Sequence, residues 1–376
     1  MIPGHFRTHF NGGGTMKKRI LACALAVTLG CLANTSMAVD LTPEEQLGKA
    51  MYMDVEFSFN QTQSCQSCHD EATGFADPEN AADPYNSFVS TGADGVQKGG
   101  RNAPTAAYAG YSPARYKTKR TGEYFGGLFW DSRADGSLLG DPLAEQAQGP
   151  PLNPVEMNMP DVAAIVEVIE GNYAEEFKIV YDFDSFDQED EAYNLFARAI
   201  AAYERSPEVL KFNSRFDRRS LTPVEEYGQG LFKMHCSSCH FMGRSRGDGP
   251  LFTSFGYANI GIPENPLVTG DEHDLGLGAV VGEKAQEGKF KIPTLRNVEK
   301  TAPYGHNGYF PTLRDVVNFK NARDSMGLTP DVAENVTNAI GNLGMTEDQV
   351  DAVVQFLLTL TDQTDTVAPQ TAAQGD

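Results

Sequence analysis

Hydrophobic residues recur at spacings of three and four along two stretches of the chain, residues 162–170 and 191–203. This period is that of one face of an α-helix, so the sequence predicts amphipathic helices at both places. A third helix is expected after Thr346, because this threonine and the glutamine three residues later can form a capping box, and the apolar pattern continues to Leu360.

Two other long stretches lack such a period. Residues 88–113 and 241–288 are rich in glycine and polar residues and show no alternation typical of strands. Loops of this length in a compact domain usually surround a functional site. From Asp362 the chain is polar and aperiodic, which predicts a disordered tail over residues 362–376.

One sequence repeat divides the chain. Residues 41–48 recur in similar form as residues 221–228, each with a threonine at the predicted N-cap, a proline at the first helical position and a glutamate three residues after the threonine. A Cys-x-x-Cys-His motif follows each copy. We therefore expect an N-terminal domain over residues 39–215 and a C-terminal domain over residues 216–361.

The N-terminal segment has the order of an export signal. A basic run at residues 17–19 precedes the apolar run 20–33, and a small-x-small site follows at residues 36–38. The apolar run is shorter than the ~20 residues that a membrane-spanning helix needs. We expect residues 1–38 to be a cleaved signal peptide that leads to the periplasm, and Met16 is a more ordinary start for it than Met1.

Composition narrows the class of protein further. The chain has 376 residues, of which 40% are hydrophobic, enough for about two folded domains with real cores. Its formal net charge of −21 would repel nucleic acid and anionic lipid, so neither is an expected partner.

The cysteine pattern supplies the candidate chemistry. The motifs Cys65–His69 and Cys236–His240 are both the c-type haem attachment sequence, in which two thiols one helical turn apart bind one porphyrin and the histidine ligates its iron. Two CxxC pairs can also build a zinc site, and a CxxC can be a thioredoxin-like redox pair. The pairs lie far apart, each has its own histidine, and no βαβ pattern is present, which favours two covalent haem c groups.

Histidine placement distinguishes the two predicted haems. No histidine lies between His69 and His235, so the first domain has no second histidine to offer its own haem. Supply from the other domain by His273 or His306 stays open. A haem with one open face can bind peroxide, whereas one with two strong ligands transfers electrons. The first haem is therefore the expected reactive centre.

Several phrases of the chain, in this order, closely resemble the bacterial di-haem cytochrome c peroxidases and their MauG-type relatives, from about Leu41 to Leu360. The phrases are Cys65–His69 with Gly74-Phe75, Gly100–Thr105, Phe129–Arg133, Glu145–Ala147, Pro150, Glu156-Met157, Cys236–His240, Lys291–Val298 and Thr301–Gly308. The resemblance implies a mostly α fold of two cytochrome-c-like helical domains with long loops, each carrying one covalent haem c. It also implies that the N-terminal haem reduces peroxide, that the C-terminal haem receives electrons, and that the protein is a homodimer.

The resemblance assigns roles to three further side chains. Glu156 matches the active-site carboxylate, and cleavage of the peroxide O–O bond needs such a group to move a proton between the two oxygens. Gln146 matches a residue of the peroxide pocket, as does Pro150. Trp130, the only tryptophan, matches the residue that relays electrons between the haems, although a core aromatic is the ordinary fate of tryptophan.

The resemblance also implies one Ca²⁺ between the domains. The matching positions are Asn102, through its side-chain oxygen, and Thr301 and Pro303, through their carbonyls. Neutral oxygens together with water suit this hard cation. His306 matches a group near the C-terminal haem that is not an axial ligand.

Two positions depart from the family pattern. Asp94 stands where many members carry a distal histidine in the first domain, and Lys320 stands where members carry the Met or Tyr ligand of the second haem. The pattern of residues 315–320 is helical, so Lys320 can point inward, and we hypothesise that its amine ligates iron. The alternatives are an exposed Lys320 with Met326 or Met345 as ligand, or an open site.

The sequence therefore predicts an exported peroxidase that reduces hydrogen peroxide with electrons from a small cytochrome c or a copper protein (cupredoxin). A second hypothesis is a MauG-like enzyme that oxidises a side chain of a partner protein. A third is a di-haem electron carrier with no peroxidase activity.

Overall fold

The computed structural model describes residue 1 and residues 40–243, 249–268 and 273–363. These residues, apart from the first, belong to one compact unit that spans Val39–Asp376. The predicted signal peptide and residues 364–376 of the predicted tail lie outside the described residues.

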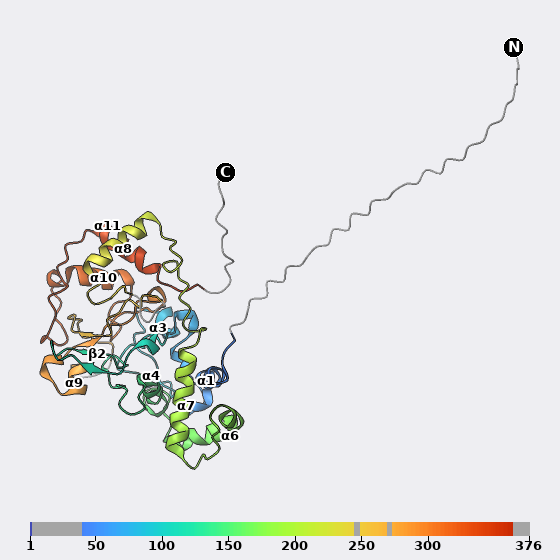
Figure 1. Ribbon diagram of the computed structural model, residues 1–376. Helices are drawn as coiled ribbons and strands as arrows, with labels where there is room; N and C mark the ends of the chain where they lie inside the picture. The colour runs from blue at the N-terminus through green and yellow to red at the C-terminus, as the bar shows by residue number, and fades with distance from the viewer. Residues whose placement is uncertain (2–39, 244–248, 269–272, 364–376) are drawn as a thin grey trace. The chain divides into compact units, whose positions relative to one another are not determined.

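Helices and long loops make up the compact unit, with very little sheet (Figure 1). The α-helices are α1 Pro43–Met53, α2 Cys65–Cys68, α3 Pro78–Ala82, α4 Pro142–Ala147, α5 Gly149–Leu152, α6 Val162–Tyr181, α7 Glu189–Glu204, α8 Pro223–His235, α9 Leu277–Val281, α10 Leu313–Ala322 and α11 Glu347–Leu358. Two antiparallel pairs of short strands complete it, β1 Tyr116–Lys117 with β2 Tyr124–Phe125, and β3 Tyr257–Ala258 with β4 Phe290–Lys291. The predicted helical fold class is confirmed.

The repeated octapeptide begins equivalent helices in the two halves. Thr42 and Thr222 each form a capping box with the glutamate three residues later, as predicted, at the starts of α1 and α8. Each copy ends in a glycine that faces a second helix. A Cβ on Gly48 would lie 1.8 Å from the carbonyl oxygen of Ala199 in α7, and a Cβ on Gly228 would lie 1.9 Å from that of Ala352 in α11. Only glycine permits these helix pairs to cross so closely.

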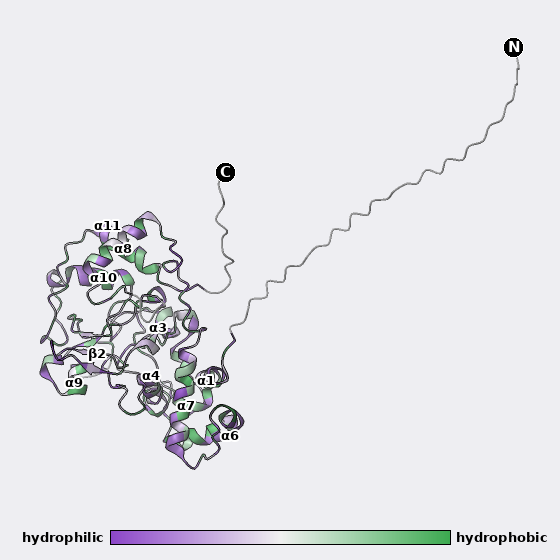
Figure 2. Ribbon diagram, viewed as in Figure 1, coloured by the Kyte–Doolittle hydropathy of each residue, from purple (hydrophilic) through white to green (hydrophobic). Residues whose placement is uncertain are grey.

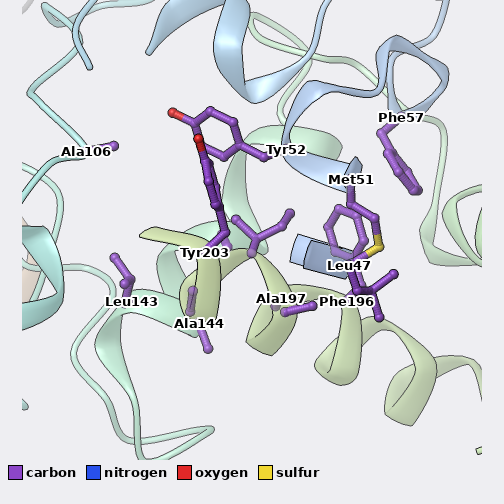
Figure 3. Packing of buried hydrophobic residues seen from close by; sticks show 14 of the residues in the cluster. Leu47, Met51, Tyr52, Phe57, Ala106, Leu143, Ala144, Phe196, Ala197 and Tyr203 are labelled. Carbon is purple, nitrogen blue, oxygen red and sulfur yellow. The ribbon is translucent and has the colours of Figure 1, made fainter. Parts of the chain in front are cut away.

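Each helix pair supports its own hydrophobic core. Leu47, Met51 and Tyr52 of α1 pack with Phe196 and Tyr203 of α7 (Figure 3). A second core joins α8, α10 and α11. The helices carry hydrophobic and hydrophilic residues together, in the mixed pattern expected of half-buried helices (Figure 2). The exact boundary predicted between residues 215 and 216 stays a prediction.

The predicted helices are present, with adjusted ends. Helix α6 begins at Val162 as expected but continues to Tyr181, because the apolar spacing persists beyond residue 170. Helix α11 has the predicted Thr346–Gln349 capping box and ends at Leu358, two residues early. The predicted irregular stretch 241–288 contains the short elements β3 and α9 in its described part.

The beginning of the predicted disordered tail is ordered, so that expectation is wrong for two residues. Asp362 accepts hydrogen bonds from the Tyr108 hydroxyl at 2.5 Å and from the Asn213 backbone amide at 3.2 Å. Gln363 is held to Asn213 as well, its N–H donating to Oδ1 at 2.8 Å. Such polar tertiary contacts produce no hydrophobic periodicity in the sequence, so the sequence pattern could not predict them.

No helix of the described residues is long and apolar enough to cross a membrane.

Candidate functional site

The first of two large cavities adjoins the Cys65–His69 motif. It holds about 1660 Å³ of space, its open mouth included. Six of the predicted side chains of the first site line it together, Cys68, His69, Trp130, Gln146, Pro150 and Glu156, whereas Cys65 packs against the adjoining hydrophobic core. The fold brings these side chains together from four segments that are separate in the sequence: α2 and the residue after it, the loop before α4, helices α4 and α5, and the loop after α5.

The attachment motif presents His69 in a defined orientation. Cys65 and Cys68 stand one turn apart at the two ends of α2, and His69 is the C-cap residue. The His69 Nδ1 lies 3.1 Å from the carbonyl oxygen of Phe75, so Nδ1 carries the proton and Nε2 keeps its lone pair. Burial lowers the pKa of His69, which keeps the ring neutral. A neutral, oriented imidazole is suited to bind a metal ion.

Glu156, which the sequence predicts to be the proton-transfer group, lines this cavity. It follows the α5 turn, and its Oε1 accepts a hydrogen bond from Asn153 Nδ2 at 2.6 Å. Burial raises the pKa of Glu156, while Asn153 and the positive charge of Arg133 partly oppose the shift. A raised pKa makes a carboxyl group better able to hold and then release a proton during general acid–base chemistry.

Glu204 is a second carboxyl group at this cavity, and it is not among the site residues predicted from the sequence. It is 5% exposed, its Oε2 has no hydrogen-bond partner among the described residues, and burial raises its pKa to about 8. It ends the buried stripe of α7 that runs through Tyr193, Ala197 and Ile200. That i, i+4, i+7, i+11 spacing is the signal that places an acid on the apolar face.

The second large cavity adjoins the other motif. It holds about 1800 Å³, its mouth included, and Cys236, Cys239 and His240 line it directly after the end of α8. The His240 Nδ1 lies 2.8 Å from the carbonyl oxygen of Phe252, which again leaves Nε2 with its lone pair. Burial, together with the charge of Lys320, lowers the pKa of His240 to about 4.

Lys320 lies in helix α10, whose register turns its side chain into the second cavity. Leu313, Val316, Val317 and Lys320 all line that cavity, as positions of one helix face. Burial lowers the pKa of Lys320. Lys320 is half-buried and its face of the helix lines the cavity, which disfavours the alternative of a fully exposed surface lysine. Of the two alternative ligands, Met345 lines the cavity, whereas Met326 packs with a different cluster.

Trp130 lies between the two cavities and lines both. Its indole Nε1 donates to the carbonyl oxygen of Asn102 at 2.8 Å, and its own carbonyl accepts from the Lys291 amide at 2.9 Å. Lys291 also lines both cavities. Its Nζ lies 3.0 Å from Ser112 Oγ, and burial lowers its pKa to about 7. No pattern in the sequence placed this lysine between the cavities.

Arg101 ties the Trp130 segment to the second half of the chain. Its guanidinium donates to Asp131 at 2.6 Å and, through two nitrogens, to Asp274 at 2.7 and 2.8 Å. Bidentate charge-assisted pairs fix geometry as well as charge. The residue beside the tryptophan is thus held by a partner far along the sequence.

The three residues matched to calcium binding belong to the wall of the second cavity. Asn102, Thr301 and Pro303 all line it. Asn102 is buried, its Nδ2 donates to the carbonyl oxygen of Phe88 at 3.0 Å, and its N–H donates to that of His306 at 2.8 Å. His306 lines the same cavity with its ring stacked on Phe290 at 3.5 Å between centroids. Of these three residues, Asn102 also lines the first cavity and accepts the hydrogen bond from Trp130.

Comparison with known proteins agrees with this arrangement of two motifs and two cavities. A family model described as di-haem cytochrome c peroxidase matches residues 42–222, and one described as cytochrome c matches residues 225–361. The methylamine utilization protein MauG of Paracoccus denitrificans is 39% identical over 84% of this chain and 88% of its own length. The chain belongs to the di-haem cytochrome c peroxidase and MauG family.

Peroxidase members of the family are also similar. The cytochrome c551 peroxidase of Pseudomonas aeruginosa is 30% identical, covering 82% of this chain and 80% of that protein. The crystal structure of the diheme peroxidase BthA of Burkholderia thailandensis superimposes with a TM-score of 0.74 at 31% identity, covering 86% of this chain and 87% of that one. Membership in this family implies an oxidoreductase with two haem c groups.

The residues at both cavities fit covalent haem c. Each motif offers two cysteines that form no disulfide and a histidine whose outward nitrogen is unprotonated. The zinc alternative does not fit, because the two CxxC pairs adjoin different cavities. Across residues 40–243, 249–268 and 273–363, no three His, Cys, Asp or Glu side chains cluster as a metal site.

The positions of Asp94 and of the histidines bear on the expectation of an open face at the first site. Asp94, at the position of the family's distal histidine, is exposed, and its Oδ1 accepts from the amides of Val96 and Gln97 in a turn. His69 is the only histidine of the described residues that lines the first cavity. His273 instead pairs with Asp331 at 2.6 Å on the exposed surface.

Proposed function

We propose that the protein is an exported peroxidase that reduces hydrogen peroxide to water with electrons from a small cytochrome c or cupredoxin. The observation that carries the proposal is the composition of the first cavity. The oriented imidazole of His69, the carboxyl group of Glu156 with its raised pKa and the amide of Gln146 line the same space, and no second histidine lines it among the described residues.

Glu156 is proposed as the acid–base group. A haem c held by Cys65, Cys68 and His69 would supply the iron that binds peroxide and the electrons that cleave the O–O bond. Glu156 then takes the proton from one peroxide oxygen and delivers it to the other, which leaves as water. The raised pKa of Glu156 suits both halves of this transfer.

Gln146 and Pro150 complete the proposed peroxide site. Gln146 can donate from its amide nitrogen and accept at its oxygen, so it can orient a small molecule with both kinds of group. Pro150 lacks a backbone N–H and offers an apolar wall. Both line the cavity beside Glu156, which supports a site for a small polar substrate.

Trp130 is proposed as the electron relay, and the second haem, held by Cys236, Cys239 and His240, as the point of electron entry. The support is that the indole lines both cavities and is fixed by a hydrogen bond to Asn102. We further propose that one Ca²⁺ binds Asn102 Oδ1 and the carbonyls of Thr301 and Pro303. Because Phe88 holds the Asn102 amide nitrogen, the side-chain oxygen is the atom left for a cation.

A second candidate function is the oxidation of a side chain in a partner protein. The identity to MauG is 39%, against 30% to the cytochrome c551 peroxidase of Pseudomonas aeruginosa, which favours this candidate. Both candidates use peroxide at the first cavity and differ in the source of the two electrons. The periplasm is the proposed location for either, and a homodimer the proposed assembly.

The test is steady-state peroxide consumption by the holoenzyme with a reduced small cytochrome c as donor, for the parent and for Glu156→Gln. The glutamine side-chain oxygen can still accept from Asn153, so the shape of the site is kept while proton transfer is lost. We expect both haems to be retained and turnover to fall about 10²–10⁴-fold. The matched control is Glu167→Gln, on the exposed face of α6.

Three outcomes separate the hypotheses. Donor oxidation that matches peroxide consumption supports the peroxidase. Peroxide consumption without donor oxidation supports the MauG-like candidate. Two low-spin ferric haems whose spectrum peroxide does not change would mean an electron carrier, and near-parental turnover of Glu156→Gln would remove Glu156 from the chemistry.

A further inference from the structure

Lys320 is the one cation of α10 that faces the second cavity. The cavity wall formed by α10 consists of Leu313, Val316 and Val317, and Lys320 continues the same face one turn further. An amine at the end of an apolar stripe, opening into a cavity, is an unusual placement for a residue type that is normally exposed.

No side chain compensates this amine. Within the described part of the chain, Lys320 Nζ has no hydrogen bond and no ion pair, and its carbonyl oxygen is the atom that holds the helix end, by accepting from Gly341. The groups whose charges act on it are the two thiols of Cys236 and Cys239 and the guanidinium of Arg323. Thiols that form thioether bonds carry no charge, so they offer no counter-ion.

The carboxylates of the same cavity are committed elsewhere. Asp274 pairs with Arg101 at 2.7 Å, and Asp331 pairs with His273 at 2.6 Å. An unpaired buried ammonium is among the most costly groups in a protein interior. The site therefore favours a neutral amine, which has a lone pair and needs an acceptor for it.

We propose that the Lys320 amine is the second axial ligand of the iron at His240. The inference rests on the proposed function, in which this cavity holds a haem c. The ammonium gives one proton to solvent, and the freed lone pair forms one N–Fe bond, with no change of oxidation state. A haem held by two nitrogen ligands would have no free position for peroxide, which suits electron transfer and leaves peroxide to the first cavity.

Two other side chains of the cavity could compete, and their surroundings disfavour them. Met345 lies in the hydrophobic core of the second half, and Asn321 holds its backbone from both sides, at 3.0 and 2.9 Å. The ring of His306 is stacked on Phe290, and it lies among the charges of Arg101 and Asp274. Of the two cationic candidates, Lys320 and His306, only Lys320 is close enough for its charge to act on Cys236 and His240.

The direct test needs no substitution. The ferric holoenzyme is produced with lysine labelled with nitrogen-15, and pulsed electron paramagnetic resonance is recorded on its low-spin signal. Coupling to a nitrogen-15 nucleus is expected. A low-spin signal that couples only to nitrogen-14 would overturn the proposal.

Variants provide the second test. Lys320→Ala should turn one low-spin ferric haem high-spin, and added imidazole should restore the low-spin spectrum by entering the vacated position. Lys320→Arg should behave like Lys320→Ala, because guanidinium does not lose its proton. The matched control Met345→Leu should keep the parental spectrum, and its conversion to high spin in place of Lys320→Ala would overturn the proposal.

The haem count separates this inference from the proposed function. A pyridine haemochrome assay should give two haems per chain for the parent and all three variants. Fewer than two in the parent would refute the proposed function itself. Two haems with a Lys320→Ala spectrum identical to the parent would refute lysine ligation and leave the proposed function intact.

Discussion

Replacement of Glu204 by glutamine should change how the stability of the protein depends on pH. Glu204 is 5% exposed at the wall of the first cavity, and within the part of the chain that the structure describes its Oε2 has no hydrogen-bond partner. Burial raises its pKa from the ordinary 4.5 to about 8, with a smaller repulsive contribution from Asp141 and an opposing one from Arg205. At neutral pH the folded protein therefore holds this side chain as a neutral carboxylic acid.

The sign of the effect follows from proton binding. Between pH 4.5 and pH 8 the unfolded chain has lost this proton and the folded chain keeps it, so the free energy of unfolding falls as pH rises. Each pH unit inside that window costs about 1.4 kcal/mol. From pH 5 to pH 8 the parent should lose about 3 kcal/mol that Glu204→Gln does not lose.

The assay is urea unfolding of the holoenzyme by circular dichroism at several pH values from 5 to 8, for the parent, Glu204→Gln and the exposed control Glu167→Gln. Other titrating groups contribute equally to all three and cancel in the differences. The glutamine amide also lacks a partner, which costs about 1–3 kcal/mol at every pH and does not change the slope. Parallel stability curves for parent and Glu204→Gln would refute the burial argument.

Two further outcomes test the link between the cavities. Trp130→Phe should keep two haems and should lose about 1–3 kcal/mol of unfolding free energy, because the Asn102 carbonyl loses its indole donor. It should also slow electron transfer between the haems, which stopped-flow reduction measures. An unchanged transfer rate would remove Trp130 from the relay. Removal of Ca²⁺ with a chelator should lower the unfolding free energy, and restored Ca²⁺ at about a hundredfold excess over its Kd should return about 2.7 kcal/mol, but not in Asn102→Ala. Equal stability with and without the ion would contradict calcium binding.

Local chemistry explains why the sequence predicted the elements of this protein. The two capping boxes use residues three positions apart, and the two attachment motifs use five consecutive residues, so each is complete within a single helical turn or two. The amphipathic periods of α6 and α7 likewise require only neighbours along the chain. Such features are present in the sequence before any tertiary contact forms.

Tertiary packing decided which side chains meet at each cavity. Glu156, Gln146 and Trp130 come from different segments, and nothing local brings them to one space beside His69. The burial of Lys291 between the cavities depends on two loops from opposite halves of the chain.

Lys320 illustrates the division most clearly. Its helix was predictable from the apolar residues around it, whereas its orientation toward His240 depends on how α10 packs against α8 and α11. Asp94, by contrast, lies at the surface. Its side chain accepts hydrogen bonds from the backbone amides of Val96 and Gln97, and this turn holds it there. Helical periodicity states which residues share a face, and only the packing of that face against the rest of the chain determines whether a charge on it meets water or a cavity.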